Sequence, residues 1–278
     1  MPSALLIGAI TRDLAADGSG SYACPGGVVH HAGLALARLG FRVRVVTRVR
    51  LQDADELLAP LCAAGAEVCI LPSRWTTTYL NDYTGPVDRH ELREVSDPIA
   101  AGDIPAAWRA CDLVQLGPLH PRDLLPETAE SLSGLVGIDL QGLFRAVGGR
   151  AAEPSTAELR RFTATARVVQ VSESELGPEL AQQPLALAQQ LGRPELVITR
   201  GARGATLICD DRQQQVPATR TTGEHLVGAG DVLLAAHLAL RALGHAPLAA
   251  ARGASAICAA KITHGLVPGD LDLEEVAA

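Results

Sequence analysis

The residues best suited to chemistry lie in the segment 227–231, Val-Gly-Ala-Gly-Asp, directly before a long apolar stretch. Two glycines separated by one residue allow a tight turn, and the apolar pattern predicts a helix over 230–243. The unpaired N–H groups and the dipole of such a helix favour an anion at its start. A carboxylate at Asp231 could then take a proton from a hydroxyl that attacks the anion. Charge stabilisation and a positioned base are what phosphoryl transfer requires.

The same turn also has a purely structural interpretation, because aspartate is a favoured helix cap and glycine is common before helices. A second glycine segment, 25–40, bears on the choice. There Gly26 and Gly27 open a predicted helix over 28–39, which closes on Leu-Gly. Alone, this segment fits any tight turn that leads into a core helix.

Composition excludes several classes of protein. The formal charge of the 278 residues is -7, and no stretch is strongly basic, which disfavours a nucleic-acid binder. Of 24 basic residues only Lys261 is a lysine, so the chain has no G-K-[ST] phosphate-binding loop. Schiff-base chemistry would depend on that single lysine, which lies in a predicted helix over 247–263.

Cysteine spacing and hydropathy indicate a cytoplasmic protein. The six cysteines form no C-x-x-C pair, which argues against a disulfide framework and against a zinc site. The start of the chain has the pattern of a first strand rather than of a signal peptide. No apolar run approaches the roughly 18 residues that a membrane span needs.

The order of the apolar segments predicts an α/β fold, a doubly wound, mostly parallel sheet with helices on both faces. Short apolar runs, several with consecutive apolar positions, alternate with helical patterns, as expected of strands covered on both faces. The predicted strands are 4–10, 42–47, 67–71, 112–116, 135–140, 167–171 and 196–199, and the predicted helices between them are 28–39, 53–64, 121–132, 156–166 and 184–191. We expect one domain over 1–278, with a β-hairpin lid inserted at about 74–97.

Taken together, the two glycine segments resemble the paired signatures of the PfkB, or ribokinase-like, carbohydrate kinases. The first signature has a Gly-Gly pair and ends in Ala-Arg-Leu-Gly, here at 37–40, and the second is Gly-Ala-Gly-Asp, here at 228–231. The hairpin resembles the lid of that family, and the segment 197–205 is similar to its nucleotide-side strand and turn. The resemblance covers the whole chain, and the four features occur in the same order and spacing.

The resemblance implies roles for particular residues. Asp231 would be the catalytic base. The backbone anion hole would consist of Gly228, Ala229 and Gly230, and the hydroxyls of the acceptor would be held by Asp13, Gly26 and Gly27. The nucleotide would lie along Ser172, Glu175, Thr199, Arg200, Gly201, Gly204, Gly228 and Gly230. Glu175 would also help to hold hydrated Mg²⁺, which keeps waters and depends on phosphate oxygens.

The chain departs from the family pattern at several positions. His31 and Ser172 stand where asparagine is usual, and Leu233 stands where an aromatic residue is usual. The residues before the Gly-Ala-Gly-Asp motif are His-Leu-Val at 225–227, in place of Asp-Thr-Thr or similar. These changes put a monovalent-cation site and hydroxyl contacts to phosphate in doubt. They leave the base and the backbone donors intact, so we expect an active kinase whose rate they could lower.

The acceptor is inferred from shorter segments. Residues 76–78, 96–99, 103–105 and 139–142, together with Arg145, look like the myo-inositol kinase branch of the family. His31 and Gln141 could each bond a ring hydroxyl. His31 could equally be a residue of the helix face, and Gln141 could bond backbone at a strand end. Arg145 could contact nucleotide phosphate or end a helix.

The sequence therefore predicts a kinase that uses ATP and Mg²⁺ to phosphorylate a small sugar or polyol, myo-inositol-like in the favoured case. The chain would be a monomer or homodimer, with no nucleic-acid or membrane partner. Two alternatives stay open, a non-catalytic sugar- or polyol-binding or regulatory protein on the same fold and a nucleoside kinase. The few aromatic residues disfavour the nucleoside kinase.

Overall fold

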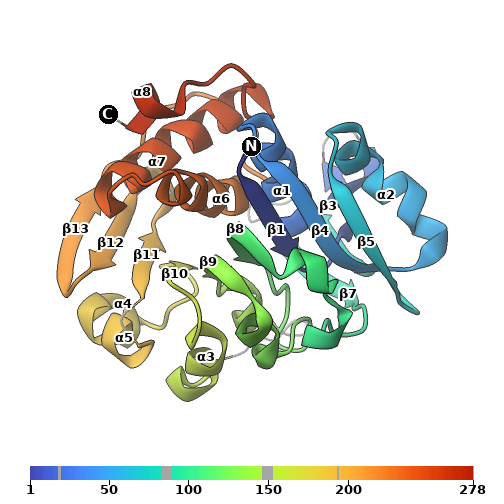
Figure 1. Cartoon of the computed structure of the whole chain (residues 1–278), viewed down its shortest axis with the longest axis horizontal. Helices are drawn as coiled ribbons and strands as arrows, with labels where there is room; N and C mark the ends of the chain where they lie inside the picture. Colours follow the sequence, from blue (N-terminus) through green and yellow to red (C-terminus); the bar gives the residue numbers. More distant parts are fainter. Residues whose placement is uncertain (18–19, 83–88, 146–152, 193, 278) are drawn as a thin grey trace.

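The computed structural model describes residues 1–17, 20–82, 89–145, 153–192 and 194–277. Its larger sheet has seven parallel strands and two antiparallel ones at one edge. The parallel strands are β1 (Ser3–Ile7), β4 (Arg42–Val49), β5 (Glu67–Pro72), β8 (Ala110–Leu116), β9 (Ser133–Asp139), β10 (Val168–Ser172) and β11 (Glu195–Thr199), and the antiparallel ones are β12 (Ala205–Cys209) and β13 (Arg212–Val216). In spatial order the sheet is β13-β12-β11-β10-β9-β8-β1-β4-β5, which Figure 1 shows as an arc.

Helices cover both faces of this sheet (Figure 1). One face carries α1 (Val28–Arg38), α2 (Leu51–Ala63), α6 (Ala229–Ala242), α7 (Pro247–His264) and α8 (Leu273–Ala277), and the other carries α3 (Thr156–Thr163), α4 (Pro178–Gln182) and α5 (Pro184–Gln190). In β1, Ala4 and Leu6 pack into one core while Leu5 and Ile7 pack into the other. Consecutive apolar residues are therefore required, and the predicted doubly wound sheet is confirmed.

One predicted helix is wrong. The segment 121–132 forms turns followed by a 3₁₀ helix, η3 (Pro126–Ser131), instead of an α-helix. Pro126 has no N–H to donate within an α-helix that began at Pro121. Leu124, between the two prolines, instead forms an isolated bridge with Ile99.

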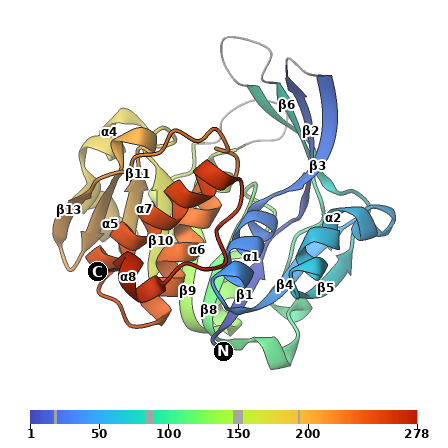
Figure 2. The same cartoon turned by 90° about the horizontal axis from the view of Figure 1, so that it is seen from above.

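The lid is larger than the predicted hairpin. The hairpin is present as β6 (Thr77–Asp82) and β7 (Arg89–Glu94), but β2 (Thr11–Asp17) and β3 (Gly20–Gly26) extend it to a four-stranded sheet in the order β3-β2-β6-β7. Figure 2 shows this sheet standing out from the body of the molecule. The sequence analysis did not predict β2 and β3, although they form a local antiparallel hairpin in which Thr11 pairs with Gly26. The distant contact is the one between β2 and β6, where Thr11 pairs with Thr77.

No helix in the described part of the chain combines the length and the apolar character needed to cross a bilayer.

Candidate active site

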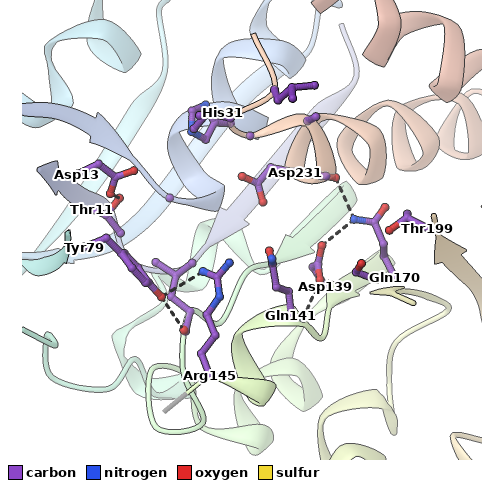
Figure 3. Close-up of a pocket in the computed structure, with 18 of the residues that line it drawn as sticks. Thr11, Asp13, His31, Tyr79, Asp139, Gln141, Arg145, Gln170, Thr199 and Asp231 are labelled. Atoms are coloured by element: carbon purple, nitrogen blue, oxygen red, sulfur yellow. Dashed lines mark hydrogen bonds between the residues drawn. The ribbon is translucent and has the colours of Figure 1, made fainter. Parts of the chain in front are cut away.

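A cavity of about 450 Å³ lies where the carboxyl ends of the parallel strands meet the start of α6. Open α/β sheets place ligands at this edge. Figure 3 shows side chains from the lid, the strand ends and α6 that point into it. The lining residues are Thr11, Asp13, Gly27, His31, Tyr79, Asn81, Leu119, Asp139, Gln141, Arg145, Gln170, Ser172, Glu175, Thr199, Gly201 and residues 226–231.

The glycine turn at the start of α6 has the conformation that its sequence predicts. Gly228 caps the helix with φ 74° and ψ 8°, a left-handed geometry that other residues adopt only with strain. A side-chain carbon on Gly228 would lie 2.2 Å from Cγ of His31, so the ring of His31 packs directly against the turn. The first turn of α6, which contains Asp231, also lines the cavity.

The carboxyl group of Asp231 is close to its titration point at neutral pH. Burial, followed by the negative charge of Asp139, raises its pKa to about 7, while Arg145 and Lys261 act in the opposite direction. A base that must accept a proton from an alcohol is most effective when its pKa lies near the working pH. The environment of Asp231 therefore suits the role inferred from the sequence.

Two buried glutamines hold this turn from the strands below it. Gln170 on β10 donates from Nε2 to Asp139 Oδ2 (2.7 Å) and to the carbonyl of Gly230 (2.9 Å). Gln115 on β8 donates to the carbonyl of Asp231 at 3.2 Å. Sequence reasoning missed both, although each is a single amide inside an apolar strand run. A buried amide needs a partner, and this need was the available signal.

The lid side of the cavity supplies acceptors for hydroxyl groups. Asp13 Oδ1 accepts from Thr11 Oγ1 at 2.7 Å, and both residues line the cavity. Gly27, the residue before α1, lines it too. Gly26 is not among the lining residues, but a side-chain carbon there would lie 2.3 Å from Asp13 Oδ2. Its lack of a side chain leaves room for the Asp13 carboxylate.

His31 and Gln141 both line the cavity, at positions where each can contact a ligand. Burial, followed by the nearby charges of His30 and Lys261, lowers the pKa of His31 to about 3, so its ring is neutral. Gln141 begins η4 (Gln141–Phe144), with its backbone N–H donated to Asp139 Oδ1 at 2.8 Å. The side chain of Gln141 does not bond backbone at the strand end but hydrogen-bonds the carboxylate of Glu175 at the cavity.

Arg145 and Tyr79 connect the cavity floor to the lid. Arg145 Nη1 donates to the hydroxyl of Tyr79 on β6 at 3.2 Å, and that hydroxyl donates to the carbonyl of Leu119 at 3.1 Å. The guanidinium group also lies over the Tyr79 ring, 5.3 Å from its centre. Sequence reasoning named Arg145 as a phosphate contact or a helix end and missed Tyr79. No spacing in the sequence links the two residues.

The residues predicted to follow the nucleotide are divided by the structure. Ser172, Glu175, Thr199 and Gly201 line the cavity already described. The pKa of Glu175 is raised to about 7 by burial and, after it, by Asp139.

A second cavity, of about 360 Å³, borders the first and contains the other predicted glycine, Gly204. It is lined mainly by apolar side chains, including Val197, Val216, Leu233 and Ala254. Six residues are shared by the two cavities: Gln170, Thr199, Gly201, Leu226, Ala229 and Gly230. Arg200 lines neither, and its guanidinium group donates to Gln215. The start of α6 therefore separates a polar cavity from an apolar one.

No family model matches the chain. Comparisons with individual known proteins agree with this architecture. A curated fructokinase from Rhizobium leguminosarum bv. trifolii is 27% identical over an alignment of 258 positions, and the match covers 84% of this chain and 76% of that protein.

Similar solved structures cover almost all of the chain. A pyrophosphate-dependent kinase in the ribokinase family, complexed with a pyrophosphate analogue and myo-inositol, has a TM-score of 0.81 at 20% identity and covers 98% of both chains. Fructokinase from Vibrio cholerae O395, with fructose, ADP and calcium bound, has a TM-score of 0.76 at 20% identity, over 95% of this chain and 94% of that one. Ribokinase from Thermotoga maritima has a TM-score of 0.76 at 15% identity, over 100% and 98%. These neighbours and the curated relative are carbohydrate kinases.

Proposed function

We propose that this chain, which has the ribokinase-like fold, is a kinase that transfers the γ-phosphoryl group of ATP to a hydroxyl of a small sugar or polyol. A myo-inositol-like acceptor is favoured. One observation carries the proposal: the start of α6 is shared by a polar cavity, which also contains Asp13 and Asp231, and an apolar cavity. An acceptor in the first and a nucleoside in the second would both reach the turn at 228–230.

Each group at the turn has a task in the reaction. Asp231 takes the proton of the acceptor hydroxyl, whose oxygen forms a bond to the γ-phosphorus as the bond from that phosphorus to the bridging oxygen of ADP breaks. The backbone N–H groups at the start of α6 stabilise the charge on the transferring group. Arg145, which lies within electrostatic range of Asp231 and Glu175, adds positive charge to the same cavity.

The apolar cavity supports ATP as the donor. Pyrophosphate, the donor named for one structural neighbour, has no apolar part that such a cavity would hold. A nucleoside does, and the backbone at Gly201 and Gly204 borders the space it would occupy. We therefore propose a nucleoside triphosphate rather than pyrophosphate.

The residues at the cavity also fit a Mg²⁺ ion that is held in part by phosphate oxygens of the phosphoryl donor. The described residues contain no cluster of three or more His, Cys, Asp or Glu side chains able to hold a metal ion. Glu175 lies at the cavity, with a pKa raised in part by the charge of Asp139, and a cation beside it would relieve that repulsion. Glu175 would hold hydrated Mg²⁺ together with phosphate oxygens of the donor. The ion would neutralise phosphate charge during transfer.

The acceptor side is equipped for hydroxyl groups. Asp13 accepts hydrogen bonds, and the amide of Gln141 and the neutral ring of His31 can each donate or accept them. Such groups match a ring that carries a hydroxyl on every carbon. We propose a single working domain in the cytoplasm, without nucleic-acid or membrane partners and active as a monomer or homodimer.

Activity measurements with a matched panel test this function. Purified protein should release ADP from ATP and Mg²⁺ when one member of a set of inositols, pentoses, hexoses and nucleosides is present. Turnover with pyrophosphate should be at least tenfold slower. The identity of the active acceptor separates the polyol kinase from the nucleoside kinase. Stabilisation of the protein against heat by an acceptor, without ADP release from any panel member, would instead establish the non-catalytic binder.

The pH dependence of acceptor turnover is a second prediction. Because Asp231 must be ionised to accept a proton and its pKa is raised to about 7, kcat/KM for the acceptor should rise with pH and level off above about 7. Initial rates from pH 5.5 to 9 measure this limb, and thermal unfolding over the same range controls for loss of structure. A rate independent of pH between 5.5 and 7 would contradict the role of Asp231 as base.

A further inference from the structure

Lys261, the only lysine of the chain, is buried behind the glycine turn. It lies on α7 with 5% of its surface exposed. Its Nζ donates to the backbone carbonyl of His225 at 2.8 Å and to that of Val227. Both partners are neutral carbonyl oxygens rather than carboxylates. Burying an ammonium group is costly, so a position that retains one requires an explanation.

The choice of lysine over arginine fits the geometry. All other basic residues in the chain are arginines, whose planar guanidinium groups suit flat, forked partners. The carbonyls of His225 and Val227 instead converge on one point. A compact ammonium with three donors satisfies such a point, whereas the planar fork of a guanidinium suits two separate acceptors.

The bond to Val227 fixes the peptide that leads into the turn. In a trans peptide the C=O of one residue and the N–H of the next point in opposite directions. Because the carbonyl of Val227 points at Lys261, the N–H of Gly228 points away from α7. Gly228 and Val227 both line the cavity that contains Asp231. The ammonium therefore sets the orientation of the first peptide of the turn from its far side.

The charge of Lys261 also reaches the reacting groups. It lowers the pKa of Asp231 and that of His31, which favours an ionised base and a neutral ring. The other charged groups that act on Asp231 are Asp139, Arg145 and Asp13. The groups that act on the pKa of Lys261 itself are Cys258 and Asp231, both of which raise it against the effect of burial.

We propose that Lys261 is a positioning residue for phosphoryl transfer: its ammonium group fixes the amides of the turn at 228–230 and supplies positive charge behind the reacting centre. This inference rests on the proposed kinase function. Removing the charge should leave the loop docked, since neutral contacts also join it to α7. His225 N–H donates to the carbonyl of Ile262 at 3.2 Å, and the hydroxyls of Thr221 and Thr263 lie 2.8 Å apart.

The variant Lys261→Met tests the proposal, with Thr263→Val as the control. Thr263→Val removes a neutral contact between α7 and the same loop without removing charge. We expect Lys261→Met to lower kcat about 10²-fold, as misplaced catalytic groups do, with a small change in the acceptor KM. The acid limb of its pH profile should move to higher pH, because Asp231 loses a favourable charge. Thr263→Val should keep both the wild-type kcat and the wild-type limb.

A chemical rescue keeps the test decisive if the methionine variant folds poorly. Lys261→Ala leaves space for a small cation, so ammonium chloride should raise its kcat at least tenfold over sodium chloride at equal ionic strength. Wild-type kcat in Lys261→Met, or equal rates of Lys261→Ala in both salts, would overturn the proposal.

The wild-type protein in the same assay separates this inference from the function on which it rests. If the wild type transfers phosphoryl groups and the variants match it, only the role of Lys261 is wrong. If the wild type transfers none, the kinase function is wrong. Hydrogen exchange at residues 228–231 then still tests the positional part: faster exchange in Lys261→Met than in Thr263→Val supports it, and equal exchange contradicts it.

Discussion

Replacement of Asp231 by asparagine should reduce kcat by about 10³-fold while the protein still folds and binds its acceptor, since a general base contributes 10²–10⁴-fold. Asparagine keeps the size and the hydrogen-bonding oxygen of aspartate but cannot take up the proton of an alcohol. The backbone donors of the turn are unchanged, so the donor should still bind. Steady-state rates with the acceptor found in the panel, and acceptor affinity by calorimetry, measure the two effects separately.

The same variant should be more stable than the wild type at alkaline pH. Because the folded-state pKa of Asp231 is raised, the folded protein binds this proton more tightly than the unfolded chain does. The stability of the wild type therefore falls as pH rises toward and through about 7, where the buried group ionises. The asparagine side chain does not ionise, so the gain in melting temperature should be larger at pH 8 than at pH 5. Near-wild-type turnover would show that Asp231 is not the base.

Replacement of Gly228 by alanine should lower kcat by about 10²–10³-fold, the loss typical when backbone donors to a developing charge are misplaced. Two effects act together. The backbone angle φ of 74° is strained for alanine, and the new methyl group would lie 2.2 Å from the ring of His31. Either the turn or the ring must move, and both border the reacting centre.

The variant Gly244→Ala separates the effect of backbone strain from the effect of the contact with His31. Gly244 also has a positive φ, 96°, but a side-chain carbon there meets no atom within 4 Å. That variant should lose about 1 kcal/mol of stability and keep its kcat. The double variant Gly228→Ala/His31→Ala lacks the ring that the new methyl group would meet. Its kcat should therefore fall less, relative to His31→Ala, than the kcat of Gly228→Ala falls relative to the wild type. If Gly228→Ala behaved like Gly244→Ala, the turn would not be the anion site.

Much of the main sheet could be predicted because its signals are local. An apolar run in β10 or β11, or a helix capped by glycine, requires only neighbouring residues to be recognised. The lid shows the limit of such signals. β2 pairs with its neighbour β3 in a local hairpin, but it joins the lid sheet through β6, more than sixty residues later.

The residues of the candidate site also divide into those with a local sequence signal and those without one. Asp231 and Gly228 lie in one short motif, so their types and spacing indicated an anion site before the fold was known. Gln170 and Tyr79 act through partners far away in the sequence, the carbonyl of Gly230 and the side chain of Arg145. Such pairs are set by tertiary packing and leave no spacing pattern to read. Pro121 and Pro126 are a local signal against an α-helix over 121–132, and the prediction of that helix did not take them into account.

The wall shared by the two cavities has a consequence for how this protein could change over time. Thr11, Asp13 and Tyr79 on the lid side belong to the polar cavity alone, whereas Val216, Leu233 and Ala254 belong to the apolar one alone. Under the proposed function, substitutions in the first set would alter which alcohol is accepted without changing the surface that would hold the nucleoside. Selection for a new acceptor could therefore act on the lid while the phosphoryl donor stays the same.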